Sequence, residues 1–166
     1  GAYLPAIESA TVSAKIIKHE WKNAMKTENF KPGIGYTYYQ PEKNINMISS
    51  FKSNLVNAGV ADIISVVKKQ RADKFAFEFS GYIKIEKDAV YDFFTASDDG
   101  SKLFIDDEEV VDNDGYHGTV EKTGRVALKK GYHKIKVLYF DSGGGNELKV
   151  FIQLQGGFKQ ELAAGM

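Results

Sequence analysis

The chain has 166 residues, of which 43% are hydrophobic and 13% aromatic, and this is enough apolar surface to bury the core of one domain. Lys plus Arg and Asp plus Glu each number 22, so the net charge is zero, which argues against binding to nucleic acid or to an anionic membrane surface. There is no cysteine, which excludes disulfides and cysteine-based metal sites, and no apolar run is long enough for a transmembrane helix.

Residues 1–32 carry no motif that indicates a function, and we interpret them as a linker or as an edge segment from a preceding domain. Thr11–Lys18 has the β-branched content of a strand, and Glu20–Glu28 has enough helix formers for a short helix. The sequence HEWKN begins like the helix motif of zinc proteases, but Asn23 replaces its second His, so we expect no zinc site. The chain starts without Met or a signal peptide, which is typical of a segment from a larger protein.

Gly33–Gln40 is the first segment with the pattern of a strand in the folded domain. Its tyrosines are Tyr36, Tyr38 and Tyr39. They could pack in the core, which we favour, or stack on a sugar ring. The polar stretch that follows has helical character over Ser49–Ala58, whereas Val60–Val67 fits a strand and a short helix almost equally well.

From Lys74 onward, apolar and polar residues alternate with the period of two that is typical of β-strands. Phe75, Phe77 and Phe79 therefore share one face of a strand. Six later strands are expected at Val90–Ala96, Lys102–Ile105, Glu109–Val111, Lys122–Leu128, Tyr132–Phe140 and Glu147–Gln155. Many short strands with turn signals between them, and no alternation with helices, predict an all-β fold, an antiparallel β-sandwich or barrel.

Acidic residues make up two of the predicted turns. Asp98-Asp99-Gly100 lies between two apolar runs, and Asp-Gly in that setting is a strong signal for a hairpin turn. One Asp would suffice for such a turn, and two adjacent carboxylates at a strand end are also a plausible start for a Ca²⁺ site. The second turn contains Asp106 and Asp107, and Asp tolerates the left-handed conformation better than most residues.

Several phrases stand in the right order for a known family, namely FAFEFSGYIKIEKDAVYDF, SDDGSKLFID, VVDNDG and LKKGYHKIKVLYFDSGGG. Together they closely resemble the PA-14 domain, which recurs in bacterial glycoside hydrolases, fungal flocculins and adhesins. The resemblance implies a β domain over residues 33–158 and a C-terminal tail over residues 159–166. The sequence is most similar to domains at the C-terminus of bacterial β-N-acetylhexosaminidases.

The resemblance also implies a site. In lectin-type members, two consecutive Asp residues joined by a cis peptide bind Ca²⁺, a second loop adds an Asn and backbone carbonyls, and sugar hydroxyls complete the metal's shell. The metal ligands carried over to this chain are Asp98, Asp99 and Asn146. The ligand-binding residues carried over are Asp98, Asp99, Ser142, Gly143, Gly144 and Gly145. The alternative is that the two Asp side chains only hydrogen-bond turn amides.

The remaining polar residues do not form a catalytic pattern. Asp112–Gly118 is expected to be a tight turn, and His117 within it to be a hydrogen-bonded structural residue. The sequence has no helix-loop-helix calcium motif, serine-nucleophile elbow, phosphate loop or dinucleotide fingerprint. Acidic pairs are abundant, but nothing places two of them on either side of a glycosidic bond.

We therefore interpret the chain as a non-catalytic, carbohydrate-binding accessory module of a secreted or surface glycoside hydrolase. Its expected partners are a glycan and a neighbouring catalytic domain, its expected cofactor is Ca²⁺, and its expected location is extracellular, on the cell surface or in the periplasm of a bacterium. One alternative is a structural module that packs against the catalytic domain without binding sugar. The other is an independent hydrolase.

Overall fold

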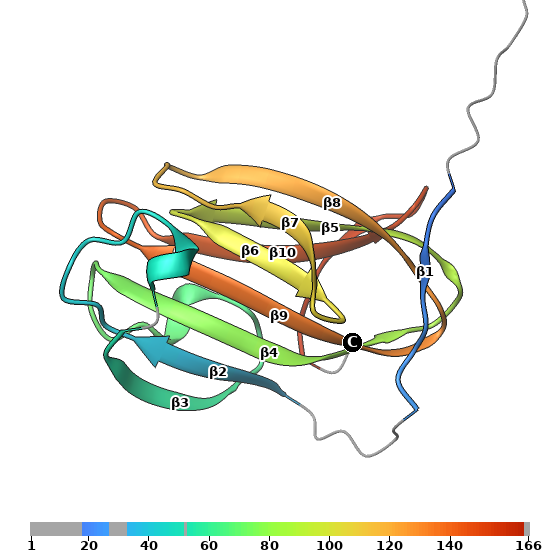
Figure 1. The fold of residues 1–166 in the computed structure, drawn as a ribbon, viewed down its shortest axis with the longest axis horizontal. Coiled ribbons are helices and arrows are strands. Elements are labelled where there is room, and N and C mark those ends of the chain that lie inside the picture. Colours follow the sequence, from blue (N-terminus) through green and yellow to red (C-terminus); the bar gives the residue numbers. More distant parts are fainter. Residues whose placement is uncertain (1–17, 27–32, 52, 165–166) are drawn as a thin grey trace, which may run out of the picture.

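The computed structural model describes residues 18–26, 33–51 and 53–164, which form two β-sheets packed face to face (Figure 1). The strand order is β1-β8-β5-β10-β11 in one sheet and β3-β2-β4-β9-β6-β7 in the other. Neighbouring strands in the described part of the chain run antiparallel, except for β1 and β8, which are parallel. The predicted all-β, antiparallel sandwich is confirmed.

The five-stranded sheet consists of β1 (Trp21–Lys22), β8 (Val120–Leu128), β5 (Ala89–Asp98), β10 (Glu147–Leu154) and β11 (Lys159–Glu161). The six-stranded sheet consists of β3 (Leu55–Ala61), β2 (Ile34–Tyr39), β4 (Phe75–Ile85), β9 (Gly131–Asp141), β6 (Ser101–Ile105) and β7 (Glu108–Asn113). Two single-turn 3₁₀ helices complete the described elements, η1 (Ile48–Ser50) and η2 (Val66–Lys68). None of the helices in the described ranges is long and apolar enough to cross a membrane.

The main core lies between the sheets and follows the predicted alternation. Phe75, Phe77 and Phe79 of β4 all point into it and are at most 1% exposed. Tyr38 is fully buried beside them, with its ring centroid 4.8 Å from that of Phe77. Tyr36 packs at the edge of the same core. Core packing is therefore the role of these two tyrosines.

A second, smaller core lies on the outer face of the six-stranded sheet. The loop between β2 and β3 folds over that face, and Ile45, Ile48 and Phe51 pack against Ala76 and Phe140. Tyr39 packs against this cluster, with its ring edge-on to Phe51. The sheet is thus buried on both faces at this end, and the loop has a fixed place.

Several local expectations are wrong. The chain is extended at Trp21–Lys22, where β1 adds to β8, so Glu20–Glu28 is not a helix over its described part. Ser49–Ala58 is not helical beyond η1, because β3 begins at Leu55. Val60–Val67 is neither one strand nor one helix, since β3 ends at Ala61 and η2 begins at Val66. The strand-like stretch Thr11–Lys18 lies outside the described residues except for its last residue.

The two chain ends of the domain also form elements. β1 continues into an isolated bridge between Met25 and Tyr132, so this segment spans from one sheet to the other. Within residues 159–166, which we expected to be a tail, β11 extends the five-stranded sheet. Leu162 beyond it is buried in the main core.

The expected hairpin at Asp98-Asp99-Gly100 does not form. β5 pairs with β8 and β10, while β6 pairs with β7 and β9, so the chain crosses here from one sheet to the other. Gly100 is required by packing and not by a positive φ. A Cβ there would lie 2.5 Å from the Phe140 ring and 2.9 Å from the backbone N and O of Gly115.

Candidate functional site

The crossover between the sheets lies at the end of the sandwich where four loops meet (left in Figure 1). The peptide bond between Asp98 and Asp99 is cis. Asp99 is 1% exposed, and its two carboxylate oxygens accept hydrogen bonds from different loops, Oδ1 from the backbone N of His117 at 3.1 Å and Oδ2 from the backbone N of Ser142 at 2.8 Å. Asp99 therefore fixes the β7–β8 and β9–β10 loops beside each other.

Asp98 has a different environment from its neighbour. It is half-buried, and no hydrogen bond or ion pair of its carboxylate is found among the described residues. The carboxylate lies against the β9–β10 loop, since a Cβ on Gly145 would be 2.7 Å from Asp98 Oδ2. Its backbone oxygen accepts a hydrogen bond from the buried hydroxyl of Tyr139 at 2.5 Å. The main chain of Asp98 is thus held while its side chain remains available.

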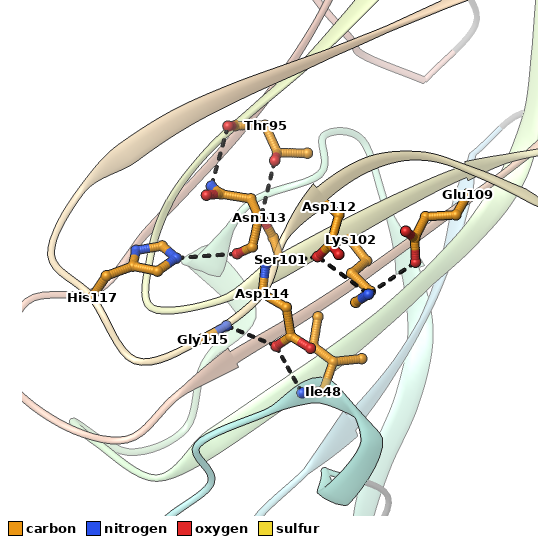
Figure 2. A network of polar contacts seen from close by, with 10 residues as sticks. All are labelled: Ile48, Thr95, Ser101, Lys102, Glu109, Asp112, Asn113, Asp114, Gly115 and His117. Carbon is orange, nitrogen blue, oxygen red and sulfur yellow. Dashed lines mark hydrogen bonds and ion pairs between the residues drawn. The ribbon is translucent and has the colours of Figure 1, made fainter.

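A buried polar network joins the strands that flank the crossover, and Figure 2 shows part of it around Asn113, Ser101 and Thr95. Asn113, at the end of β7, is 2% exposed, and its Nδ2 donates to Ser97 Oγ at 3.0 Å and to the backbone O of Val120 at 2.9 Å. Ser101 Oγ lies 2.7 Å from Ser97 Oγ and donates to Thr95 Oγ1 at 3.0 Å. These bonds join the strands on both sides of the crossover, which positions Asp98 and Asp99.

The loop after β7 has the structural role that its sequence predicts. The His117 ring nitrogens lie 3.1 Å from the backbone O of Asn113 and 2.8 Å from that of Gly118, so the ring closes this loop. Asp114 Oδ1 accepts a hydrogen bond from the backbone N of Ile48 at 2.9 Å, which ties the loop to η1. Figure 2 shows His117 and Asp114 pointing in these two directions.

The β9–β10 loop brings the other expected residues to the same place, because Glu147 pairs with Asp98 in the sheet. A Cβ added at Gly143 or Gly144 would have no atom within 4 Å, so these two residues leave open space at the rim. Ser142 is buried, and its hydroxyl exchanges hydrogen bonds with the backbone of Ile45. Ser142 therefore contacts the site through its backbone N, which donates to Asp99, and not through its hydroxyl.

Asn146 lies in this loop, but its amide points to the segment after β3. Its Oδ1 accepts a hydrogen bond from Lys69 Nζ at 2.5 Å, and its Nδ2 donates to the backbone O of Ala72 at 3.1 Å. The structure thus brings Asp98, Asp99 and the loop of Asn146 together, and it turns the Asn146 amide toward a lysine.

One further carboxylate lies at the site. Asp141 ends β9, is fully buried, and accepts a hydrogen bond from the backbone N of Lys74 through Oδ2 at 3.1 Å, while its Oδ1 has no hydrogen-bond partner. Burial raises the pKa of Asp141 to about 7, and the nearby charge of Asp99 adds to this. Burial likewise raises the pKa of Asp99. Asp141 was not singled out from the sequence, although the period of two in β9 places it on the same inward face as Ile135, Val137 and Tyr139.

The donors fit a hard cation in part. All are oxygens, which Ca²⁺ prefers, and the buried Asp141 has one carboxylate oxygen without a hydrogen-bond partner, while the charge of Asp98 contributes to its raised pKa. However, no group of three or more His, Asp or Glu side chains among the described residues is arranged to hold a metal. A cation here would therefore need the amide oxygen of Asn146 or backbone carbonyls beside the two consecutive aspartates.

The family model of the PA14 domain matches residues 30–159. The chain is 30% identical over 152 residues to "Probable beta-glucosidase I" of Neosartorya fischeri, a match that covers 81% of this chain and 18% of that protein. It is 26% identical over 162 residues to "Beta-hexosaminidase" of Porphyromonas gingivalis, covering 86% of this chain and 20% of that protein. The chain thus spans about a fifth of the length of these relatives.

A solved structure described as "PA14 sugar-binding domain from RTX adhesin" has the same fold, with a TM-score of 0.68 at 16% identity, and the match covers 80% of this chain and 95% of that one. The fold, the order of the motifs and the match over most of the chain agree with one another. This chain belongs to the PA14 domain family.

Proposed function

We propose that this chain is a non-catalytic, carbohydrate-binding module of a glycoside hydrolase, and that it binds its glycan through Ca²⁺ at the sheet crossover. The observation that carries the proposal is the division of labour between the two aspartates. Each oxygen of Asp99 accepts one backbone hydrogen bond, which holds two loops together and leaves a second lone pair on each oxygen, whereas the half-buried carboxylate of Asp98 has no partner among the described residues and faces the glycine-rich loop. A carboxylate fixed in this way, beside open space, is available for a ligand.

In this proposal Asp98, Asp99 and Asn146 hold the cation, and backbone carbonyls of the β9–β10 loop add to them. Ca²⁺ takes about six to eight oxygen ligands, more than these side chains supply, so vicinal hydroxyls of a sugar have room to complete the shell. The glycines at 143–145, of which Gly144 and Gly145 are exposed, let a sugar ring approach without meeting a side chain of their own. The names of the related β-glucosidase and β-hexosaminidase favour β-linked glucose or N-acetylhexosamine as the first sugars to test.

Thermal unfolding in EDTA and in millimolar Ca²⁺ tests the metal. A ligand at about 100 times its dissociation constant stabilises the native state by about 2.7 kcal/mol, which raises the Tm of a domain of this size by roughly 5–10 °C. Asp98→Asn should abolish this rise and leave the Tm in EDTA unchanged, because the Asp98 carboxylate makes no hydrogen bond that the fold needs. If the wild-type Tm does not respond to Ca²⁺, the metal mechanism is wrong.

Sugar binding is then measured directly, by titrating β-linked disaccharides of glucose and of N-acetylglucosamine in Ca²⁺ and in EDTA. The proposal predicts heat of binding for at least one disaccharide in Ca²⁺ only, and none with Asp98→Asn. Binding that persists in EDTA would mean a glycan site that does not use the metal. We expect no hydrolysis of these disaccharides by the chain itself, since Asp99 and Asp141 are buried and serve the fold.

A second candidate function, packing against a neighbouring domain, is favoured by the opposite end of the sandwich. Phe158 is 90% exposed there, beside an apolar groove lined in part by Tyr91, Ile152 and Leu154. In a longer polypeptide that joins this chain to a hydrolase domain, Phe158→Asp should lower the Tm of the pair and leave that of the isolated chain unchanged. Equal effects in both would remove this candidate.

If either function holds, the module works where sugars and their hydrolases meet. We therefore also propose a location outside the cytoplasm, in the extracellular space, on the cell surface or in the periplasm. Extracellular calcium modules commonly bind with dissociation constants of about 10⁻⁴–10⁻³ M, so weak metal binding is consistent with this location.

A further inference from the structure

The segment around η2 forms one wall of the site, although no sequence pattern pointed to it. Lys69 Nζ donates to Asn146 Oδ1 at 2.5 Å, and the backbone O of Ala72 accepts from Asn146 Nδ2 at 3.1 Å. The backbone N of Lys74 donates to the buried carboxylate of Asp141 at 3.1 Å. This segment is thus attached to both ends of the β9–β10 loop.

The contact of Lys69 with Asn146 conflicts with metal binding. The Asn146 amide oxygen is the side-chain atom that Ca²⁺ would use, and here it accepts a hydrogen bond from an ammonium group. Calcium–oxygen distances are about 2.3–2.6 Å, so a metal on that oxygen would lie at most about 5 Å from Lys69 Nζ. Two cations at that separation repel each other, so binding the ammonium and the metal to the same oxygen at once is electrostatically unfavourable.

We propose that Lys69 sets the calcium affinity of the site by occupying the Asn146 oxygen in the metal-free protein. Calcium binding then exchanges one cation for another, and Lys69 Nζ leaves Asn146 as the metal arrives. This inference rests on the proposed calcium site and adds a residue outside the two carbohydrate-site loops.

The surroundings of Lys69 allow this exchange. Lys69 is exposed, and the only other contact of its ammonium group among the described residues is a distant one, with Nζ 5.9 Å from the centroid of the Phe75 ring. An exposed hydrogen bond of this kind contributes little to stability, so little is lost when it breaks. The opposite role is also testable: if Lys69 served to hold Asn146 in place for the metal, its removal would weaken calcium binding.

The neighbouring lysine supplies a matched control. Lys68 is also exposed, and its side chain has no hydrogen bond or ion pair in the described part of the chain, so Lys68→Met removes the same charge without removing the contact with Asn146. Lys69→Met keeps the aliphatic stem and removes the ammonium, and Lys69→Arg keeps the positive charge.

The experiment is a calorimetric Ca²⁺ titration of the wild type and these three variants at low and at physiological ionic strength. A doubly charged and a singly charged ion about 5 Å apart in water repel by enough to change a dissociation constant by about tenfold at low salt, and salt reduces this. We expect Lys69→Met to bind Ca²⁺ about five- to tenfold more tightly, Lys68→Met to change it less than about twofold, and Lys69→Arg to resemble the wild type.

The proposal is overturned if the wild type binds Ca²⁺ and Lys69→Met binds it no better than Lys68→Met, or more weakly than the wild type. Binding by Lys69→Met in a range where the wild type shows none would support it. If no form binds at several millimolar Ca²⁺, then both the calcium site and the role of Lys69 fall, and this result differs from the failure of Lys69 alone.

Discussion

Replacing Asp99 with Ala tests how much the hydrogen bonds of this buried aspartate stabilise the fold. Asp99 is 1% exposed, and its two oxygens accept backbone hydrogen bonds from two loops, at 3.1 and 2.8 Å. The change leaves the backbone N–H groups of His117 and Ser142 without their acceptor. Because Ser142 is buried, water does not readily reach its N–H group to replace the lost carboxylate.

The size of the effect follows from two opposing terms. Hydrogen bonds to a charged acceptor contribute about 1.5–3 kcal/mol each, so two of them contribute about 3–6 kcal/mol. The cost of burying the carboxylate, seen in the raised pKa of Asp99, offsets part of this. We therefore expect Asp99→Ala to lower the free energy of unfolding by about 2–4 kcal/mol, and Asp98→Ala to lower it by less than about 0.5 kcal/mol.

Urea unfolding in EDTA measures this difference without any contribution from a bound metal. Asp99→Asn serves as the intermediate case, since its amide keeps one acceptor and turns a donor toward the second N–H. Equal losses of stability in the two alanine variants, or a loss below about 1 kcal/mol for Asp99→Ala, would show that Asp99 does not hold the loops in this way.

Three other predictions concern separate features. Gly145→Ala places a Cβ 2.7 Å from Asp98 Oδ2, so it should weaken Ca²⁺ binding severalfold in calorimetry with little loss of stability. Gly144→Ala, at a φ of +99° in open space, should lower the free energy of unfolding in urea by about 1 kcal/mol and leave Ca²⁺ binding unchanged. Asp107→Gly relieves a φ of +67° and loses only an exposed ion pair with Lys134, so its Tm should be unchanged or higher by up to about 3 °C. The folded-state pKa of Asp141 is raised to about 7, so the native state binds the proton of this carboxyl group more tightly than the unfolded chain does. The Tm in EDTA should therefore fall as the pH rises from about 4 to about 7, and Asp141→Asn should reduce this dependence of Tm on pH.

The sequence predicts the strands well wherever alternation decides the outcome. In β4 the rings at every second position from Phe75 to Phe79 all face the main core, and Ala76 between them is buried in the second core on the other face. β2 was also predicted well, but the segment between β2 and β3 was predicted poorly because its apolar residues cover a different surface. Ile45, Ile48 and Phe51 are spaced for neither a strand nor a helix, and they cover the outer face of a sheet formed mainly by later residues.

The candidate site could be predicted as a set of residues but not as an arrangement. Asp98, Asp99 and the glycine loop meet as the family resemblance implies, because β5 and β10 are neighbours in the sheet. The Asp-Gly signal predicted a hairpin, and only long-range packing shows why Gly100 is there. Its missing Cβ lets the crossover pass between the Phe140 ring and the Gly115 backbone. The contact between Lys69 and Asn146 joins residues 77 positions apart, which no local pattern reveals.

The two candidate functions use opposite ends of the same strand. β10 starts beside Asp98 at the loop end and finishes at the apolar groove beside Phe158, and its eight residues span roughly 24 Å. A domain docked over the groove would therefore leave the crossover loops free in solvent. A glycan bound at the crossover would in turn leave the groove free. Packing and sugar binding are thus compatible in one module, and loss of one through Phe158→Asp or Asp98→Asn should leave the other intact.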